Sequence, residues 1–93
     1  MKQFKPLNDF FEGIKNDPHI GCSHIALYTA LYNLWVSQGC LGPVVIFSYT
    51  IMPIAKIGGL GTYHKTIREL NEYGYLRYEA TFNRKGSKVY LVD

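Results

Sequence analysis

Basic side chains, the groups that bind anions most directly, are concentrated in residues 56–93. This part of the chain holds seven lysines and arginines against four acidic residues, whereas residues 1–55 hold three of each. The excess of three equals the net charge of the whole 93-residue chain. A net charge of +3 does not by itself indicate a nucleic-acid partner, but its localisation favours an anionic partner for the C-terminal half.

Nine side chains in this half have the chemistry for contacts with an anionic polymer. Lysine and arginine reach phosphates or the N7 and O6 atoms of guanine, while threonine and histidine suit base edges or phosphate oxygens. A serine hydroxyl can donate a hydrogen bond to a phosphate. The predicted binding residues are Lys56, Thr62, His64, Lys65, Arg68, Arg84, Lys85, Ser87 and Lys88.

Each group of candidates also has a purely structural interpretation. The helical ones form a mixed face, in which Glu69 and Glu72 could pair with Lys65 and Arg68 at i,i+4 spacing. The last three basic residues flank a glycine with no acidic residue near them in the sequence, but a basic hairpin tip also aids solubility. Lys56 lies at the C-terminal end of a predicted helix, where its charge also favours the helix dipole.

Other chemistries have little support in the sequence. The "GGLG" of residues 58–61 lacks the order of a phosphate-binding P-loop and follows no strand. His19, Cys22, His24 and Cys40 are zinc-ligand types, but their spacing matches no familiar zinc module. The two cysteines lie at opposite ends of one predicted helix, about 27 Å apart, which excludes a disulfide between them. No nucleophile motif is present, so we expect no enzyme activity, cofactor or metal.

Hydrophobic periodicity predicts two helices in the first forty residues. A short amphipathic helix is expected at residues 6–16, where Pro6 suits its start, and exposed rings on it, Phe10 and Phe11, could form a dimer surface. The second helix, at residues 23–38, is apolar around most of its girth. We therefore expect it to form the centre of the core.

The remaining residues predict a strand, two helices and a hairpin. The "VVIF" run predicts a strand at residues 44–47. A two-turn helix is expected from an N-cap at Thr50 to Ile57, with Pro53 in its first turn. After the turn at residues 58–61, a helix at 61–73 buries one face and stops at Gly74. Alternating residues then predict two strands joined by the basic loop "FNRKGSK". The inward side chains of the last helix are Tyr63, Ile67 and Leu70.

These elements fit one α+β domain over residues 1–93. Its parts are an N-terminal helical extension (1–21), a core helix, strand and helix (22–57), a turn and helix (58–73) and a C-terminal hairpin (74–93). The chain has neither the apolar run of a signal peptide nor one long enough to span a membrane. We therefore expect a cytoplasmic protein with no membrane partner.

A short helix, a glycine-containing turn and a longer helix form the pattern of a helix-turn-helix, and a hairpin directly after it is typical of a wing. Residues 54–92, "IAKIGGLGTYHKTIRELNEYGYLRYEATFNRKGSKVYLV", resemble bacterial winged helix-turn-helix DNA-binding proteins. The "TYHK" start, the "EL" and "GYL" segments and the "KGSKV" hairpin are similar to small regulators and replication initiators of plasmids, phages and conjugative elements.

The resemblance implies binding to double-stranded DNA, with helix 61–73 in the major groove and a wing at residues 82–88 along the backbone. It implies a transcriptional regulator or a replication-initiation factor of a mobile element. A homodimer is expected, because one module contacts few bases. The alternative is a winged helix that binds a protein partner. The chain departs from the family at Gly59, Leu60 and Gly61, where related sequences usually carry Ser, Thr or Lys.

Overall fold

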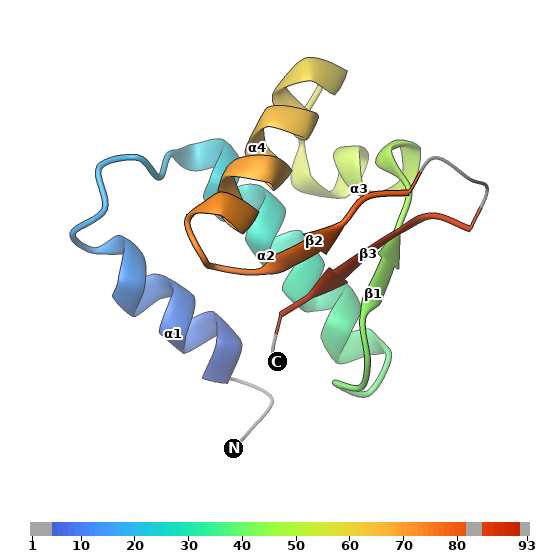
Figure 1. Cartoon of the computed structure of the whole chain (residues 1–93), viewed down its shortest axis with the longest axis horizontal. Coiled ribbons are helices and arrows are strands. Elements are labelled where there is room, and N and C mark those ends of the chain that lie inside the picture. The colour runs from blue at the N-terminus through green and yellow to red at the C-terminus, as the bar shows by residue number, and fades with distance from the viewer. Residues whose placement is uncertain (1–4, 82–84, 92–93) are drawn as a thin grey trace.

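The chain adopts an α+β fold of four helices and a three-stranded antiparallel sheet in the residues described, 5–81 and 85–91, of a computed structural model (Figure 1). The helices predicted at residues 6–16 and 23–38 and the strand at 44–47 are confirmed to within two residues. The elements in chain order are α1 (Lys5–Ile14), α2 (Cys22–Ser37), β1 (Val44–Ile46), α3 (Ser48–Ala55), α4 (Leu60–Glu72), β2 (Arg77–Glu79) and β3 (Ser87–Tyr90).

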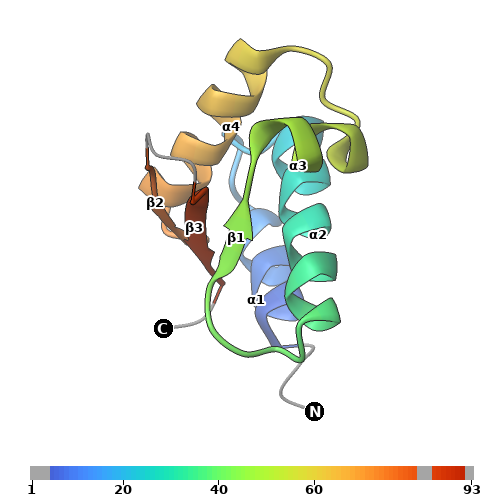
Figure 2. The ribbon, with the colours of Figure 1, turned by 90° about the vertical axis from the view of Figure 1, so that its right-hand side faces the viewer.

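Helix α2 is the centre of the core, as its apolar girth predicts. Leu27, Tyr28, Leu31 and Trp35 are each no more than 3% exposed. The helix contacts α1, α3, α4 and β1, so the other three helices and one strand of the sheet pack on it. In Figure 2, α1 and α2 lie on one side of the sheet, while α4 lies above the part formed by β2 and β3.

The sheet has the strand order β1-β3-β2, so the second strand of the hairpin lies in the middle. Val89 pairs with Val44 of β1 on one side and with Tyr78 of β2 on the other. Val44, Ile46 and Val89 are buried, and Val45 between the first two is 47% exposed. Because side chains alternate along a strand, one face of the sheet packs against the helices and the other faces solvent.

Helix α4 ends at Gly74, as the sequence predicts. Gly74 has φ +84°, and the N–H of Tyr75 donates to the carbonyl of Leu70 at 3.0 Å while that of Gly74 donates to Asn71 at 3.2 Å. These two bonds make a Schellman motif. Helix α3 ends in the same way, but its left-handed residue is Lys56 at φ 60°, where a side chain costs about 1 kcal/mol.

Helix α3 begins three residues earlier than predicted. Its N-cap is Phe47 rather than Thr50, and the N–H groups of Thr50 and Ile51 both donate to the carbonyl of Phe47 at 3.0 Å. Pro53 therefore lies in the interior of the helix and not in its first turn. The helix starts directly after β1 because the strand fixes the chain up to Ile46, and the side chain of Phe47 supplies no capping bond.

The turn between α3 and α4 is also displaced from its predicted position. It covers residues 56–59 instead of 58–61, because Leu60 and Gly61 already belong to α4. Gly59 is the N-cap, extended at φ −108° and ψ 130°, and has no side chain to cap the helix. The start of α4 is therefore not capped by a side chain of its N-cap residue.

The two phenylalanines of α1 have different environments, which corrects the expectation of a two-ring exposed patch. Phe10 is 2% exposed and stacks on Tyr28 with ring centroids 4.0 Å apart. Phe11 is 40% exposed. Phe10 therefore fixes α1 to the core, and only Phe11 remains at the surface.

Tyr75 connects the end of α4 to the loop after α1. Its hydroxyl donates to Oδ2 of Asp17 at 2.6 Å, and the N–H of His19 donates to Oδ1 at 3.0 Å. The hydrogen bond from Tyr75, followed by that from His19, holds the pKa of Asp17 below its ordinary value of 3.8. Burial, followed by the hydrogen bond and the charge of Asp17, raises the pKa of Tyr75 from 10.0 to about 12.

We expect Tyr75→Phe to lower stability most at intermediate pH. The native contact is lost as pH falls through the lowered pKa of Asp17, because both states then carry a protonated carboxyl. From pH 10 to about 12 the unfolded wild-type chain releases the Tyr75 proton while the folded chain keeps it, which destabilises wild type only. Urea denaturation of both proteins across the pH range measures the difference. Tyr49→Phe, at an exposed ring, is the control, and a difference that is constant with pH contradicts the assignment.

No helix within residues 5–81 and 85–91 is long and apolar enough to cross a membrane.

Candidate nucleic-acid interface

Helix α4 presents the predicted basic residues on its exposed side. Tyr63, Ile67 and Leu70 are each at most 2% exposed, which confirms them as the inward face. The helix also buries Thr66, whose hydroxyl donates to Oγ of Ser23 on α2 at 3.3 Å, a contact that periodicity did not predict. The predicted candidates on this helix are all exposed: Thr62, His64, Lys65 and Arg68.

The structural interpretation expected Glu69 to pair with a basic residue of its own helix. In the structure it pairs with neither Lys65 nor Arg68. Its Oε1 lies 2.9 Å from Nε2 of His24 on α2. Nδ1 of His24 accepts the N–H of Gly21 at 3.0 Å, so Nε2 carries the proton and donates to the carboxylate. Glu69 is therefore directed toward α2, where it links α4 to the core helix.

As a consequence, the positive charges of α4 are not neutralised by an ion pair within the described residues and can interact with an external partner. In the described part of the chain, neither Lys65 nor Arg68 has a carboxylate within 4.0 Å. Nε of Arg68 donates to the carbonyl of His64 at 3.2 Å, one turn earlier in the same helix. This bond orients the guanidinium along the helix without neutralising it.

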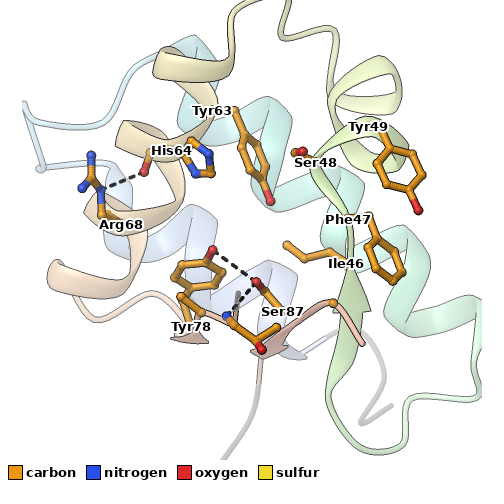
Figure 3. A pocket seen from close by; sticks show the side chains of 12 residues that line it. Ile46, Phe47, Ser48, Tyr49, Tyr63, His64, Arg68, Tyr78 and Ser87 are labelled. Atoms are coloured by element: carbon orange, nitrogen blue, oxygen red, sulfur yellow. Dashed lines mark hydrogen bonds between the residues drawn. The ribbon is translucent and has the colours of Figure 1, made fainter. Parts of the chain in front are cut away.

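A groove of about 420 Å³ lies beside α4, between this helix, the start of α3 and the hairpin (Figure 3). His64 and Arg68 line it from α4, and hydroxyl groups and aromatic rings line most of the rest. Tyr49 at its α3 side is 75% exposed and stacks on Phe47 at 5.4 Å. The complete lining is Ile46, Phe47, Ser48, Tyr49, Tyr63, His64, Arg68, Tyr78, Ala80, Thr81, Gly86 and Ser87.

Ser87 lies in this groove, but its hydroxyl is engaged within the hairpin. Its Oγ accepts the N–H of Thr81 at 3.2 Å and the hydroxyl of Tyr78 at 3.5 Å, so it holds the two strands together. The Oγ proton remains for a ligand. The main role of Ser87 is therefore to stabilise the hairpin, and its hydroxyl proton is the group that could also contact a ligand.

Lys85 and Lys88, the candidates in the described part of the hairpin, do not line the groove. Lys88 pairs in register with Val45 and Glu79, on the solvent face of the sheet and away from the groove. With Lys85 it lines a separate depression that includes Glu79, an acidic residue that is not near these lysines in the sequence. Strand pairing brings this carboxylate near. Arg84 lies outside the described residues.

Lys56 and Thr62 lie on the other side of α4. Both line a depression formed with the first turns of α2, next to Gly58 and Gly59. Seven of the nine candidates therefore divide into three sets. His64, Arg68 and Ser87 share the groove, Lys56 and Thr62 share the α2 side, and Lys85 and Lys88 share the outer face of the hairpin, while Lys65 is exposed on α4.

Sequence reasoning missed the tyrosines of the groove. Tyr63 was assigned to the core, and Tyr78 to a strand, because both fit the hydrophobic period. The available signal was the residue type, since a tyrosine in a core position requires a place for its hydroxyl.

Metal binding finds no support in the described residues, where no three His, Cys, Asp or Glu side chains are grouped to hold an ion. His24 is engaged by Gly21 and Glu69, and both Cys22 and Cys40 are free thiols.

Comparisons of the chain with protein families, with curated proteins and with solved structures find no match, so its function is inferred from its own geometry.

Proposed function

We propose that this chain binds double-stranded DNA as a winged helix-turn-helix protein. Helices α3 and α4 with the turn at residues 56–59 form the helix-turn-helix, and the β2–β3 hairpin is the wing. Helix α4 enters the major groove, and the hairpin lies along the backbone. The biological role is regulation of transcription, and the protein acts as a homodimer.

The observation that carries the proposal is the state of Lys65 and Arg68. Both are exposed on one helix, and in the part of the chain described neither has a carboxylate partner. Glu69, which i,i+4 spacing places near Lys65, is bonded to His24 instead. A helix with unneutralised cations on its exposed side suits both phosphate and guanine contacts.

The position of α4 also supports insertion into a groove. In both Figure 1 and Figure 2 the N-terminal turns of α4 rise at the top of the protein, clear of the sheet. This is the end that carries Thr62, His64 and Lys65. Figure 1 places α3 beside it, as the first helix of a helix-turn-helix would lie.

Titration onto a random-sequence duplex at 50 and 200 mM salt tests the proposal. Six cations contribute if each neutralises one phosphate, namely Lys56, Lys65, Arg68, Arg84, Lys85 and Lys88. The slope of log K against log salt is then roughly −5, and affinity falls about 10³-fold between the two salt concentrations. Absence of binding at 50 mM salt, or binding indifferent to salt, excludes the proposal.

A protein-interaction module is the second candidate, because apolar side chains are exposed on the same two helices. Leu60 in the first turn of α4 is 53% exposed, and Ile54 on α3 is 46% exposed. A failed DNA titration favours this function. Selection of bound sequences from a random DNA pool tests the homodimer, since a palindromic site reports both sequence specificity and two-fold symmetry.

A further inference from the structure

In the part of the chain that the structure describes, the hydroxyl of Tyr63 is a hydrogen-bond donor with no partner, on a side chain that is otherwise buried. The side chain is 2% exposed, and within the described residues its hydroxyl makes no hydrogen bond. Figure 3 shows the ring reaching from α4 into the groove with its oxygen at the tip. Among the same residues, Trp35 Nε1 is the only buried side-chain N or O atom that lacks both a partner and contact with solvent. The Tyr63 hydroxyl therefore opens into the groove.

The start of α3 faces the same groove without a cap. Phe47 supplies no capping bond, and the first N–H groups used within the helix are those of Thr50 and Ile51. The N–H groups of Ser48 and Tyr49 thus remain without acceptors in the part of the chain described. Unused N–H groups at a helix start attract anions, and the helix dipole adds to this attraction.

The charged side chains around the groove also favour an anionic ligand. Arg68 lines it, and no aspartate or glutamate is among its lining residues. Burial is the first cause that raises the pKa of Tyr63 to about 12, so at neutral pH its hydroxyl keeps the proton that it would donate. The uncapped start of α3 and the Tyr63 hydroxyl thus face one open groove, and Arg68 lies at its α4 edge, where Figure 3 shows the guanidinium directed away from Tyr63.

We propose that the groove binds a phosphate group, held by the Tyr63 hydroxyl and the first N–H groups of α3, with Arg68 at the α4 edge of the groove as the nearby positive charge. If α4 occupies the major groove, the strand that borders it runs between α4 and the hairpin. The ligand is then a phosphodiester of the DNA backbone, and this source rests on the proposed function. Tyr63 becomes a binding residue, in addition to its place in the core.

Tyr63→Phe tests the role of the hydroxyl because it keeps the ring. We expect affinity for duplex DNA to fall about tenfold, as for a lost hydrogen bond to a charged acceptor. The melting temperature should not fall, since an unpartnered hydroxyl is removed, and the salt slope should not change, since no charge is removed. Tyr28→Phe is the matched control: its hydroxyl donates to the carbonyl of Pro6 at 3.0 Å, so it should lose stability and keep affinity.

Amide NMR locates the phosphate independently of affinity. Duplex DNA and, separately, inorganic phosphate are titrated into the full chain while the N–H signals of Ser48 and Tyr49 are followed. Shifts of these signals with duplex, together with weaker binding by Tyr63→Phe, support the proposal. Shifts with inorganic phosphate alone, in a chain that binds no duplex, support the site with free phosphate as its ligand. Duplex binding that leaves these signals and the Tyr63→Phe affinity unchanged overturns the inference while the proposed function stands.

Discussion

Replacing Lys65 and Arg68 together with alanine is expected to weaken binding to duplex DNA by about 100-fold at moderate salt. The slope of log K against log salt should become shallower by about two, because each contact with a phosphate accounts for nearly one. Direct contacts of either side chain with guanine would add loss of sequence preference. Fluorescence anisotropy with a labelled duplex at several salt concentrations measures both quantities.

The double variant should leave the fold intact. Both side chains are exposed, and in the described part of the chain neither pairs with a carboxylate, so only the bond from Arg68 to the carbonyl of His64 is lost. Alanine is a good helix former, and the melting temperature should remain within a few degrees of wild type. A large decrease would make any loss of affinity uninformative.

A charge-matched control separates a local contact from a general effect of net charge. Lys15→Ala with Arg77→Ala removes the same two residue types at other places, one paired with Glu12 at 3.0 Å and one over the ring of Tyr90 at 4.1 Å. We expect this pair to shift affinity only slightly. Equal losses in the two double variants would mean that α4 is not the interface.

The inward face of α4 could be predicted because local periodicity determines it. The same is true of the glycine that ends the helix, since a left-handed residue at that position satisfies the last carbonyls. Partners from distant parts of the chain were not predictable in this way. Glu69 is bonded to His24, which is 45 residues away in the sequence, whereas local spacing pointed to its neighbours on the helix.

The groove was also beyond prediction, because it is formed by pairing that sequence patterns do not encode. Strand β1 adds to the outer side of β3, and this brings the start of α3 next to the hairpin. Only then do Ser48, Tyr63 and Arg68 line one space. The sequence predicts Tyr63 and Arg68 on opposite faces of one helix and leaves Ser48 between two predicted elements, so none was expected to share a site with the others.

Gly86 is a point where this non-local pairing becomes a strict steric requirement. The sequence predicts a turn there, and φ is +84°. A Cβ atom at this position would lie 2.9 Å from Cγ1 of Val45, 3.0 Å from Cζ of Phe47 and 3.1 Å from the carbonyl oxygen of Ile46. Glycine is therefore required both by the backbone angle and by the close approach of β1.

Gly86→Ala is expected to lower the free energy of unfolding by about 2–3 kcal/mol, combining the left-handed backbone with overpacking. The carbonyl is backbone and cannot yield as a side chain end can, so β1 and the hairpin must move apart. Gly58→Ala is the matched control, because nothing lies within 4 Å of its Cβ and its φ is not left-handed. It should change stability by no more than about 1 kcal/mol. Urea denaturation of both variants measures the difference.

The same substitution reports on the groove if the variant is studied under conditions in which it stays folded. Phe47 is the N-cap of α3, so a hairpin displaced from it alters the position of the helix start relative to Tyr63. We expect Gly86→Ala to bind duplex more weakly than Gly58→Ala even where both are fully folded. Equal affinity together with equal stability would show that β1 and the hairpin are not held as close as the 2.9 Å contact requires. Lower stability with unchanged affinity would assign Gly86 to the fold alone.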